Sequence, residues 1–265
     1  MKILMTGSGF LAKEFSSEFG DSCIIKANRR NLTDLDYLKD IVKDNAIDHI
    51  IHTSWAGVGA GTIDDYNWNI QVDDNMHKIS DKVSKVFTFG SGIEFMSPRN
   101  CGMPLYQKAK AIVALNARYN ERVINLRLFG CFGKNENYTR FIKQSVRRLK
   151  VGRPVQISKR RDIDFFYSKD LVRVIEHYMN SSEDLPGEVD CVYSTNTLNT
   201  LTSIADHLVI SYSEPFDSIK YVNEGYVKYL SDEWDEPYTG EGAILNSLGI
   251  ELVGIEKGIE EIYGT

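Results

Sequence analysis

Short apolar runs alternate with amphipathic stretches along the first half of the chain. The apolar runs lack a period of two, which is typical of strands buried on both faces of a parallel sheet. We expect five such strands, at Lys2–Thr6, Cys23–Ala27, His49–Thr53, Val86–Phe89 and Val123–Leu126. Helices are expected between them, at Leu11–Phe19, Leu35–Asn45, Asp65–Val83 and Leu105–Asn120. This alternation predicts an α/β fold built on a doubly wound parallel sheet, with helices on both faces.

The regular alternation ends near Gly130. A basic amphipathic stretch follows at Phe141–Lys150, and beyond it the elements become short and mixed. Further helices are expected at Lys169–Met179, Leu201–Ile210, Glu241–Leu248 and Ile255–Tyr263. We therefore expect a core of residues 1–129, to which residues 160–183 return. Residues 130–159 and 184–265 would form a smaller, mixed lobe.

Composition and charge narrow the class of protein. The chain has 265 residues, 42% of them apolar, which suits one or two globular domains. Its net charge of −6 argues against a nucleic-acid partner but leaves room for a local basic pocket. The apolar runs are far shorter than the roughly 20 residues of a membrane-spanning helix, and the first residues lack a signal-peptide layout. We expect a cytoplasmic protein with no membrane partner.

Nothing in the sequence predicts a metal site or a disulfide framework. The four cysteines are widely spaced and contain no C-x-x-C pair. His49 and His52 lie three apart in a predicted strand, so their side chains would point to opposite faces and make a poor metal pair. We therefore expect no bound metal.

A glycine-rich motif follows the first predicted strand. Gly7-Ser8-Gly9-Phe10-Leu11-Ala12 matches G-x-G-x-x-[GA] directly before a predicted helix. Gly7 would permit the tight turn, Gly9 would let a pyrophosphate approach the backbone, and Ala12 would allow close packing of helix on strand. The N–H groups at the start of the helix would then bind the phosphates. The motif in this context predicts a dinucleotide-binding site.

The end of the second predicted strand bears on which dinucleotide binds. NAD-selective proteins place a carboxylate here for the ribose 2′-hydroxyl, whereas NADP binders use arginine for the 2′-phosphate. This chain reads Asn28-Arg29-Arg30-Asn31-Leu32, and no acid follows until Asp34. The pattern favours NADP, with Arg29 or Arg30 at the 2′-phosphate. The alternative is that both arginines face solvent and the site accepts NAD as well as NADP.

Tyr106 and Lys110 are four apart in the helix expected after the fourth strand, so they share one face. A nearby ammonium is expected to lower the pKa of Tyr106, which could then exchange a proton with a substrate oxygen while hydride moves to or from nicotinamide. Ser91, at the end of the fourth strand, could bind the same oxygen. Chance alone gives about one such Tyr–Lys pair. The prediction therefore depends on the position of the pair, at the sheet edge where α/β folds bind ligands.

Together these motifs resemble the extended short-chain dehydrogenase/reductases, the superfamily of nucleotide-sugar epimerases, dehydratases and reductases. The resemblance implies a Rossmann-type fold. It departs at the glycine motif, which is one residue shorter than TGxxGxxG, and at Gly130, where the family has Asn. It is carried by the segments Thr6–Ala12, His52–Ser54, Asn69-Ile70, Phe89–Ser91, Tyr106–Lys110, Arg127–Gly133 and Arg161–Leu171.

The resemblance also implies roles for individual residues. Lys110 would hold the nicotinamide ribose, and Arg161 would contact the nucleotide diphosphate of the substrate. Apart from the resemblance, Phe141 could pack around the sugar or base, although aromatic residues at helical spacing are usually core. Relatives often pair through the helix that carries the tyrosine, so a homodimer is possible. The cofactor-binding residues expected on this basis are Gly7, Ser8, Gly9, Phe10, Leu11, Asn28, Arg29, Arg30, Asn31, Leu32, Thr53, Ser54, Asn69 and Lys110.

The residues after Ser91 separate the reactions of the superfamily. Its dehydratases carry Asp-Glu there, where this chain has Gly92 and Ile93, and Glu94 would face the other way in a strand. Epimerases that invert carbons three and five use Cys at the position of Ile93. We therefore expect an NADP-dependent reductase of a nucleotide-linked 4-keto-6-deoxyhexose, an enzyme of deoxysugar biosynthesis. The alternatives are a nucleotide-sugar 4-epimerase with tightly bound NAD and a non-catalytic dinucleotide-binding sensor.

Overall fold

The computed structural model describes residues 1–20, 23–57, 61–96, 104–194, 198–212 and 225–264. Its main sheet has six parallel strands in the order β2-β1-β3-β4-β5-β9. These are β1 (Ile3–Thr6), β2 (Ile24–Ala27), β3 (His49–His52), β4 (Lys85–Ser91), β5 (Val123–Leu128) and β9 (Glu188–Asp190). The order reverses between β1 and β3, and the carboxyl edge of such a sheet is where α/β folds bind ligands.

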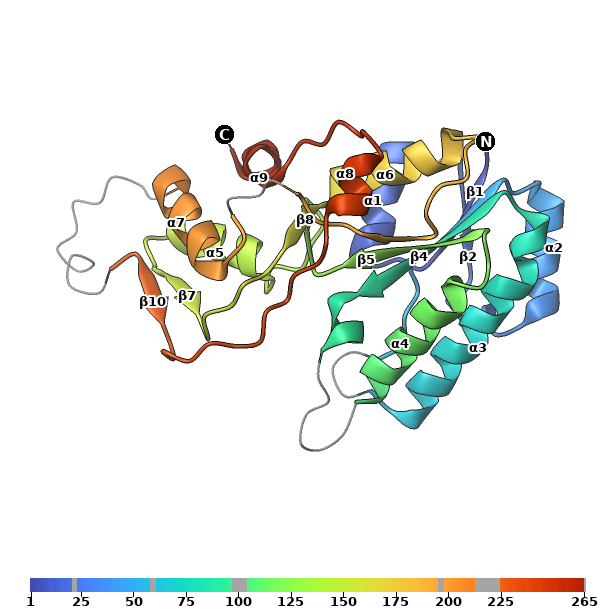
Figure 1. The fold of residues 1–265 in the computed structure, drawn as a ribbon, viewed down its shortest axis with the longest axis horizontal. Helices are drawn as coiled ribbons and strands as arrows, with labels where there is room; N and C mark the ends of the chain where they lie inside the picture. Colours follow the sequence, from blue (N-terminus) through green and yellow to red (C-terminus); the bar gives the residue numbers. More distant parts are fainter. Residues whose placement is uncertain (21–22, 58–60, 97–103, 195–197, 213–224, 265) are drawn as a thin grey trace.

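Two layers of helices cover the sheet (Figure 1). One face packs against α1 (Phe10–Phe19), α6 (Ser168–Asn180) and α8 (Ala243–Ser247), and the other against α2 (Leu35–Asn45), α3 (Ile63–Ile79) and α4 (Leu105–Ala117). Phe15 and Tyr178 are fully buried in the first layer, and Leu38 and Met76 in the second. The sheet is therefore apolar on both faces, as the absence of period-two alternation predicts. The Rossmann-type α/β fold expected from the sequence is confirmed.

A smaller lobe lies beyond the carboxyl edge of the sheet (Figure 1). It has two short parallel pairs, β10 (Val227–Tyr229) with β7 (Val155–Ile157), and β6 (Gly130–Phe132) with β8 (Phe165–Tyr167). Its helices are α5 (Phe141–Leu149), α7 (Leu201–Tyr212) and α9 (Ile255–Tyr263). A second apolar cluster, which includes Ile142, Val146 and Ile204, holds these elements together.

The structure corrects part of the expected division of the chain. Glu188–Asp190, expected in the smaller lobe, pairs with β5 as the sixth strand of the core sheet. Leu245, in the same part of the chain, is buried in the core cluster. The pattern concealed β9 because only one of its three residues, Val189, is apolar. The remaining boundaries stay predictions.

Short 3₁₀ turns join some of the longer elements, among them η2 (Arg29–Asn31), η3 (Ser80–Lys82) and η4 (Gly92–Phe95). The helix expected to run to Val83 is shorter in the structure. It stops at Ile79 as α3, and η3 follows it directly. The turn η4 follows β4 directly and so places its residues beside Ser91.

Candidate active site

The glycine turn has the geometry that phosphate binding requires. Gly7 has φ +108°, and a Cβ there would lie 2.6 Å from Thr53 Oγ1, so only glycine fits. Gly9 begins α1 without a side-chain cap, and no atom lies within 4 Å of where its Cβ would be. The first N–H groups of α1 are thus open to an anion, as a dinucleotide pyrophosphate requires.

A cavity of about 360 Å³ lies at the carboxyl edge of the sheet, next to this turn. It gathers residues from the ends of β3, β4 and β5, from α4 and from the smaller lobe. Seven of the residues predicted from the sequence line it: Phe10, Leu11, Thr53, Ser54, Ser91, Tyr106 and Lys110. The three residues expected to carry the chemistry therefore share one cavity.

Tyr106 is a protonated phenol at neutral pH. Burial raises its pKa to about 12, neighbouring Tyr238 and Glu94 add to the rise, and a hydrogen bond with Ser91 partly opposes it. The expectation that Lys110 lowers this pKa is wrong in this structure, because desolvation of the ring dominates and Lys110 is not among the groups that shift it. The side chain is therefore a proton donor rather than a base.

Lys110 is buried one helical turn from Tyr106. Its Nζ donates a hydrogen bond of 2.7 Å to the carbonyl of Phe89 and lies 3.6 Å from the centre of the Trp55 ring. Burial lowers its pKa to about 8, opposed by the carboxylates of Glu94 and Asp73. Lys110 is thus charged at neutral pH but loses its proton in mildly basic solution.

The turn after β3 supplies polar atoms without protein partners. Ser54 Oγ and Trp55 Nε1 are buried and make no hydrogen bond within the described chain, and both residues line the cavity. Buried polar groups usually have a partner, so two such atoms at one cavity fit a polar ligand. Trp55 also meets Tyr106 edge to face, with ring centres 5.9 Å apart. Sequence reasoning missed Trp55.

His52 also lines the cavity, but it is not an acid at neutral pH. Its Nδ1 shares a hydrogen bond of 2.7 Å with Thr6 Oγ1 at the end of β1. Burial and then the charge of Lys110 lower its pKa to about 3, so the ring is neutral. Tyr106 is therefore the better proton donor.

Asn69, expected to bind the cofactor, instead supports this turn. Its amide oxygen accepts from Ala56 N and its amide nitrogen donates to Ala56 O, both at 2.9 Å. The side chain is buried in α3 and does not line the cavity. Its visible role is to fix the backbone that presents Ser54 and Trp55.

The turn after β2 places the two candidate arginines differently. Both arginines are exposed. Arg29 donates to the carbonyl of Trp55 at 3.0 Å and lies over the ring of Trp68, whereas the guanidinium of Arg30 makes no hydrogen bond or ion pair within the described residues. Asp34 caps α2 by accepting from the first N–H groups of that helix. Of the other residues expected here, Asn28 caps η2, Asn31 is exposed, and the side chain of Leu32 is fully buried in the core.

Arg161 and Phe141, expected to bind substrate, do not line the cavity. Arg161 Nε donates to the carbonyl of Glu236 at 2.9 Å, and its guanidinium pairs with Asp235 at 3.1 Å. Phe141 stacks on Phe165 within the apolar cluster of the smaller lobe.

Two cavity residues from distant parts of the chain were missed by sequence reasoning. Arg140, at the start of α5, contributes an exposed guanidinium that lowers the pKa of Tyr106. Tyr238 places its hydroxyl 2.8 Å from Ser91 Oγ. Neither belongs to a local motif, although Arg140 directly precedes the basic helix that the sequence does indicate.

Glu94 does not line the cavity, but the reason is not the strand that the sequence predicted for it. It lies in η4 rather than in a strand, and its Oε1 accepts from Ser91 N at 2.6 Å. Its Oε2 accepts from Arg127 Nε at 2.8 Å, and both side chains are almost completely buried. The carboxylate thus supports Ser91 from behind.

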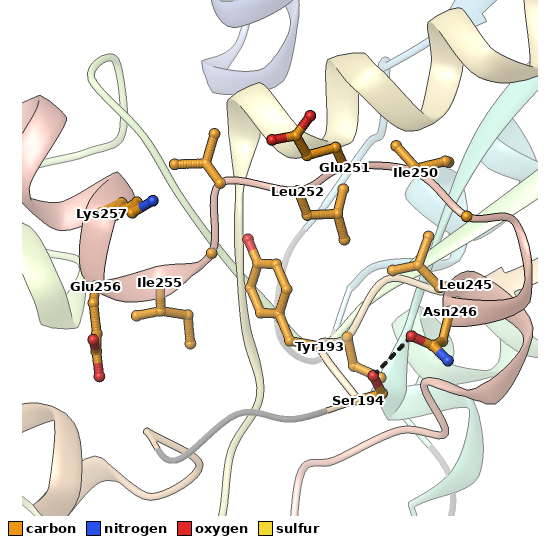
Figure 2. A pocket seen from close by; sticks show the side chains of 14 residues that line it. Tyr193, Ser194, Leu245, Asn246, Ile250, Glu251, Leu252, Ile255, Glu256 and Lys257 are labelled. Carbon is orange, nitrogen blue, oxygen red and sulfur yellow. Dashed lines mark hydrogen bonds between the residues drawn. The ribbon is translucent and has the colours of Figure 1, made fainter.

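A larger hollow of about 700 Å³ lies elsewhere, between residues 249–257 and the chain around Tyr193 (Figure 2). Tyr193 donates its hydroxyl to Asp170, and Ser194 donates to Asn246, so these polar groups are used within the protein. The hollow contains none of the residues predicted to act on a ligand. We therefore place the active site in the smaller cavity.

Within the described ranges, no three His, Cys, Asp or Glu side chains are grouped to hold a metal ion. The helices described there are also too short or too polar to cross a membrane.

Residues 106–193 match the model of the NAD dependent epimerase/dehydratase family. No curated protein sequence matches the chain. The family model supports the expected resemblance over residues 106–193, and solved structures of under 25% identity share the fold over nearly the whole chain.

Solved structures of several such enzymes share the fold. A GDP-mannoheptose C4 reductase from Campylobacter jejuni with NADP bound is 17% identical, with a TM-score of 0.73 over 99% of this chain and 96% of that one. A UDP-N-acetylglucosamine 4-epimerase from Bacillus cereus is 16% identical, with a TM-score of 0.73 over 99% and 98%. A dTDP-glucose 4,6-dehydratase from Bacillus anthracis in complex with NAD is 16% identical, with a TM-score of 0.72 over 99% and 95%. Because three reactions share one fold, the residues of the site must distinguish them.

Proposed function

We propose that the protein is an NADPH-dependent reductase of a nucleotide-linked 4-keto sugar, of the 6-deoxyhexose class. The observation that carries this proposal is the meeting of Ser91, protonated Tyr106 and Lys110 in one cavity. That cavity adjoins a turn with the geometry of a pyrophosphate site. The similar structures with NADP or NAD bound support a nicotinamide dinucleotide as cofactor.

The residues present fit such a cofactor. Gly7 and Gly9 leave room for phosphate at the start of α1, and Ser54 and Trp55 offer buried polar atoms at the cavity. When bound, the reduced nicotinamide would supply hydride to the carbonyl carbon. Arg30 is an exposed cation at the turn where a 2′-phosphate is recognised, and its guanidinium has no protein partner within the described residues, which favours NADP.

The chain's own residues would complete the reduction. Ser91 donates a hydrogen bond to the substrate carbonyl oxygen, and Tyr106 transfers its phenol proton to that oxygen as the alcohol forms. Lys110, on the same helix face, would hold the nicotinamide ribose, as the family resemblance implies, and its ammonium places a positive charge in the cavity where negative charge develops on the substrate oxygen. The protonated state of Tyr106 suits this direction, because the reaction consumes one proton together with the hydride.

Dehydration is disfavoured by the residues around Ser91. Gly92 and Ile93 offer no carboxylate, and Glu94 is bound to Arg127 and the backbone of Ser91. A 4-epimerase stays the second candidate, because the Bacillus cereus enzyme has the same fold at nearly the same similarity. An epimerase would retain NAD and regenerate it within each cycle.

We propose that Arg140, in addition to Arg161, binds the diphosphate of the substrate. Arg140 lines the cavity with an exposed guanidinium, and arginine can bind phosphate in a bidentate manner. Arg161 would have to leave Asp235 or use its remaining donors. Phe141 stays a proposed contact for the sugar or base.

The test is a panel of dTDP-, GDP-, CDP- and UDP-linked 4-keto-6-deoxyhexoses, each offered with NADPH and with NADH. We expect one of them to consume reduced cofactor and yield the 4-hydroxy sugar. Release of NAD on denaturing the purified protein, with interconversion of 4-epimers and no net cofactor use, would establish the epimerase instead. Cofactor binding without turnover of any sugar would indicate a sensor.

A further inference from the structure

Residues 233–241, here called the strap, cross from the smaller lobe back to the core. The strap runs beside residues 160–164, and its position is fixed by backbone hydrogen bonds from Arg160 to Glu233, Asp235 to Arg160, Tyr238 to Asp162 and Asp164 to Tyr238, at 2.8 to 3.2 Å. Beyond Tyr238 the backbone of Gly240 donates to the Asp164 carboxylate at 3.0 Å. The strap therefore holds Tyr238 from both sides.

The ring of Tyr238 fills a space shaped for it. It meets Phe129 edge to face, with ring centres 5.5 Å apart. A Cβ on Gly92 would lie 2.3 Å from the Phe129 ring and 2.9 Å from the Tyr238 ring, so the turn after Ser91 has room only for glycine. The packing explains why an aromatic residue is here, but a phenylalanine would satisfy it equally.

The hydroxyl of Tyr238 requires a separate explanation. It lies 2.8 Å from Ser91 Oγ, whereas the hydrogen bond from Ile93 N to Ser91 Oγ is long, at 3.5 Å. A serine hydroxyl has one proton to donate and two positions that accept. If Tyr238 donates to one of these positions, the serine proton stays available for the cavity, where Tyr106 lies.

We propose that Tyr238 is a positioning residue, whose hydroxyl donates to Ser91 Oγ and thereby directs the serine proton toward the substrate carbonyl oxygen. This inference rests on the proposed reductase function, because that reaction is the one that requires Ser91 to act as a donor. Burial raises the pKa of Tyr238, which keeps it protonated and able to donate at neutral pH. The strap thus links the smaller lobe directly to the reacting oxygen.

The experiment combines Tyr238→Phe with Ser91→Ala in a double-mutant cycle. We expect Tyr238→Phe to lower kcat about tenfold with the substrate KM changed less than about twofold, because ring packing is kept and only the serine proton is misdirected. In the Ser91→Ala background the same substitution should cost nothing further. Tyr229→Phe is the matched control, because its hydroxyl bonds Thr202 Oγ1 outside the cavity, and it should leave kcat unchanged.

Two measurements that do not depend on turnover accompany the cycle. The Kd for NADPH should stay unchanged in Tyr238→Phe. The Tm losses of the two single variants should not add in the double variant, because the bond between Tyr238 and Ser91 is lost only once.

A wild-type kcat in Tyr238→Phe would overturn the inference, as would an equal loss in both Ser91 backgrounds or a Tm loss that simply adds. Failure of the unmodified protein to reduce any 4-keto sugar would instead overturn the proposed function, and the positioning role with it.

Discussion

The protonation states of two side chains decide which direction of reaction the site is ready to perform. Tyr106, with a pKa of about 12, holds a proton that it can give to an alkoxide forming beside it. Lys110, with a pKa of about 8, holds a positive charge in the same cavity at neutral pH. A proton donor in a cavity that also holds a cation suits carbonyl reduction, because negative charge develops on the carbonyl oxygen.

Replacing Tyr106 by Phe removes the proton donor but keeps the ring. We expect turnover to fall by about 10² to 10⁴, the usual contribution of a general acid, with NADPH affinity nearly unchanged. Steady-state kinetics and a fluorescence titration with NADPH check both statements. Tyr119→Phe, at an exposed tyrosine just beyond α4, is the control and should behave like the unmodified protein. Near-normal turnover in a folded Tyr106→Phe protein would exclude the tyrosine as the acid.

The charge on Lys110 predicts a basic limb in the pH profile. Burial lowers its pKa to about 8, so the ammonium is present below that pH and lost above it. We expect kcat/KM for reduction to fall above about pH 8, by about tenfold for each further pH unit. In Lys110→Met this limb should be absent and activity low throughout. A profile that is flat to pH 10 in the unmodified protein would show that the charge is not required.

Ser91, Tyr106 and Lys110 could be found in the sequence because they lie on β4 and α4, which follow one another along the chain. Tyr238 could not, because no pattern in Pro237-Tyr238-Thr239 connects it to a serine 147 residues earlier. The sequence also could not predict the direction in which the pKa of Tyr106 shifts. Spacing reveals the neighbouring lysine but not the desolvation that outweighs it.

At the scale of elements, two turns at the sheet edge are coupled. The turn η2 after β2 reaches the turn after β3 through Arg29, which donates to the Trp55 carbonyl. Trp55 in turn covers Lys110. Arg29 therefore acts on the arrangement of the cavity. Arg30 is the better candidate for the cofactor phosphate, because its guanidinium has no protein partner within the described residues.

This difference predicts distinct effects for the two arginines. We expect Arg30→Ala to lower kcat/KM for NADPH by about 10- to 100-fold and to leave the value for NADH almost unchanged, because only a 2′-phosphate contact is lost. Arg29→Ala should weaken the use of both cofactors, because Trp55 loses its anchor. Parallel kinetics with NADPH and NADH check this, with exposed Lys39→Ala on α2 as control. Better use of NADH than NADPH by the unmodified protein would contradict the cofactor assignment.

Elements with a clear apolar pattern were predictable, and elements without one were not. The first five strands, α1 and α2 lie close to where the apolar pattern predicts them, because each buries several consecutive or helically spaced residues. Glu188–Asp190 buries one side chain and was missed, and Gly92–Phe95 was expected to be extended but forms a 3₁₀ turn. In both segments tertiary contacts of charged residues, rather than an apolar pattern, fix the conformation.

At the scale of the whole molecule, buried carboxylates join distant parts of the chain. Glu14 on α1 accepts hydrogen bonds from Asn135 and from Ser168. Glu136 accepts from the Tyr263 hydroxyl at the end of α9, and burial raises its pKa to about 7. The bond from Asn135 to Glu14 joins the core to the loop before α5. The bond from Tyr263 to Glu136 joins that loop to α9.

Glu136 makes stability depend on pH. Its pKa of about 7 in the folded protein exceeds the ordinary value of 4.5, so folding favours the protonated carboxyl. The stabilisation that Glu136 gives the folded protein is therefore fully present below about pH 4.5 and is lost as the pH rises through 7. We expect Glu136→Gln to raise the free energy of unfolding by about 1–3 kcal/mol above pH 7, and by little near pH 4.5. Thermal unfolding at both pH values measures this, with exposed Glu121→Gln as control. An equal effect at the two pH values would show that ionisation of Glu136 is not responsible.

The distance along the chain between Ser91 and Tyr238 has a consequence during synthesis. At about 5–20 residues per second, a ribosome needs roughly 7–30 s to add the 147 residues that separate them. The glycine turn and β1 to β3 precede Ser91 in the chain, and α4, with Tyr106 and Lys110, and β5 are added within that interval. A newly made molecule therefore acquires its dinucleotide-binding half first, and the tyrosine beside Ser91 arrives only with the last part of the chain.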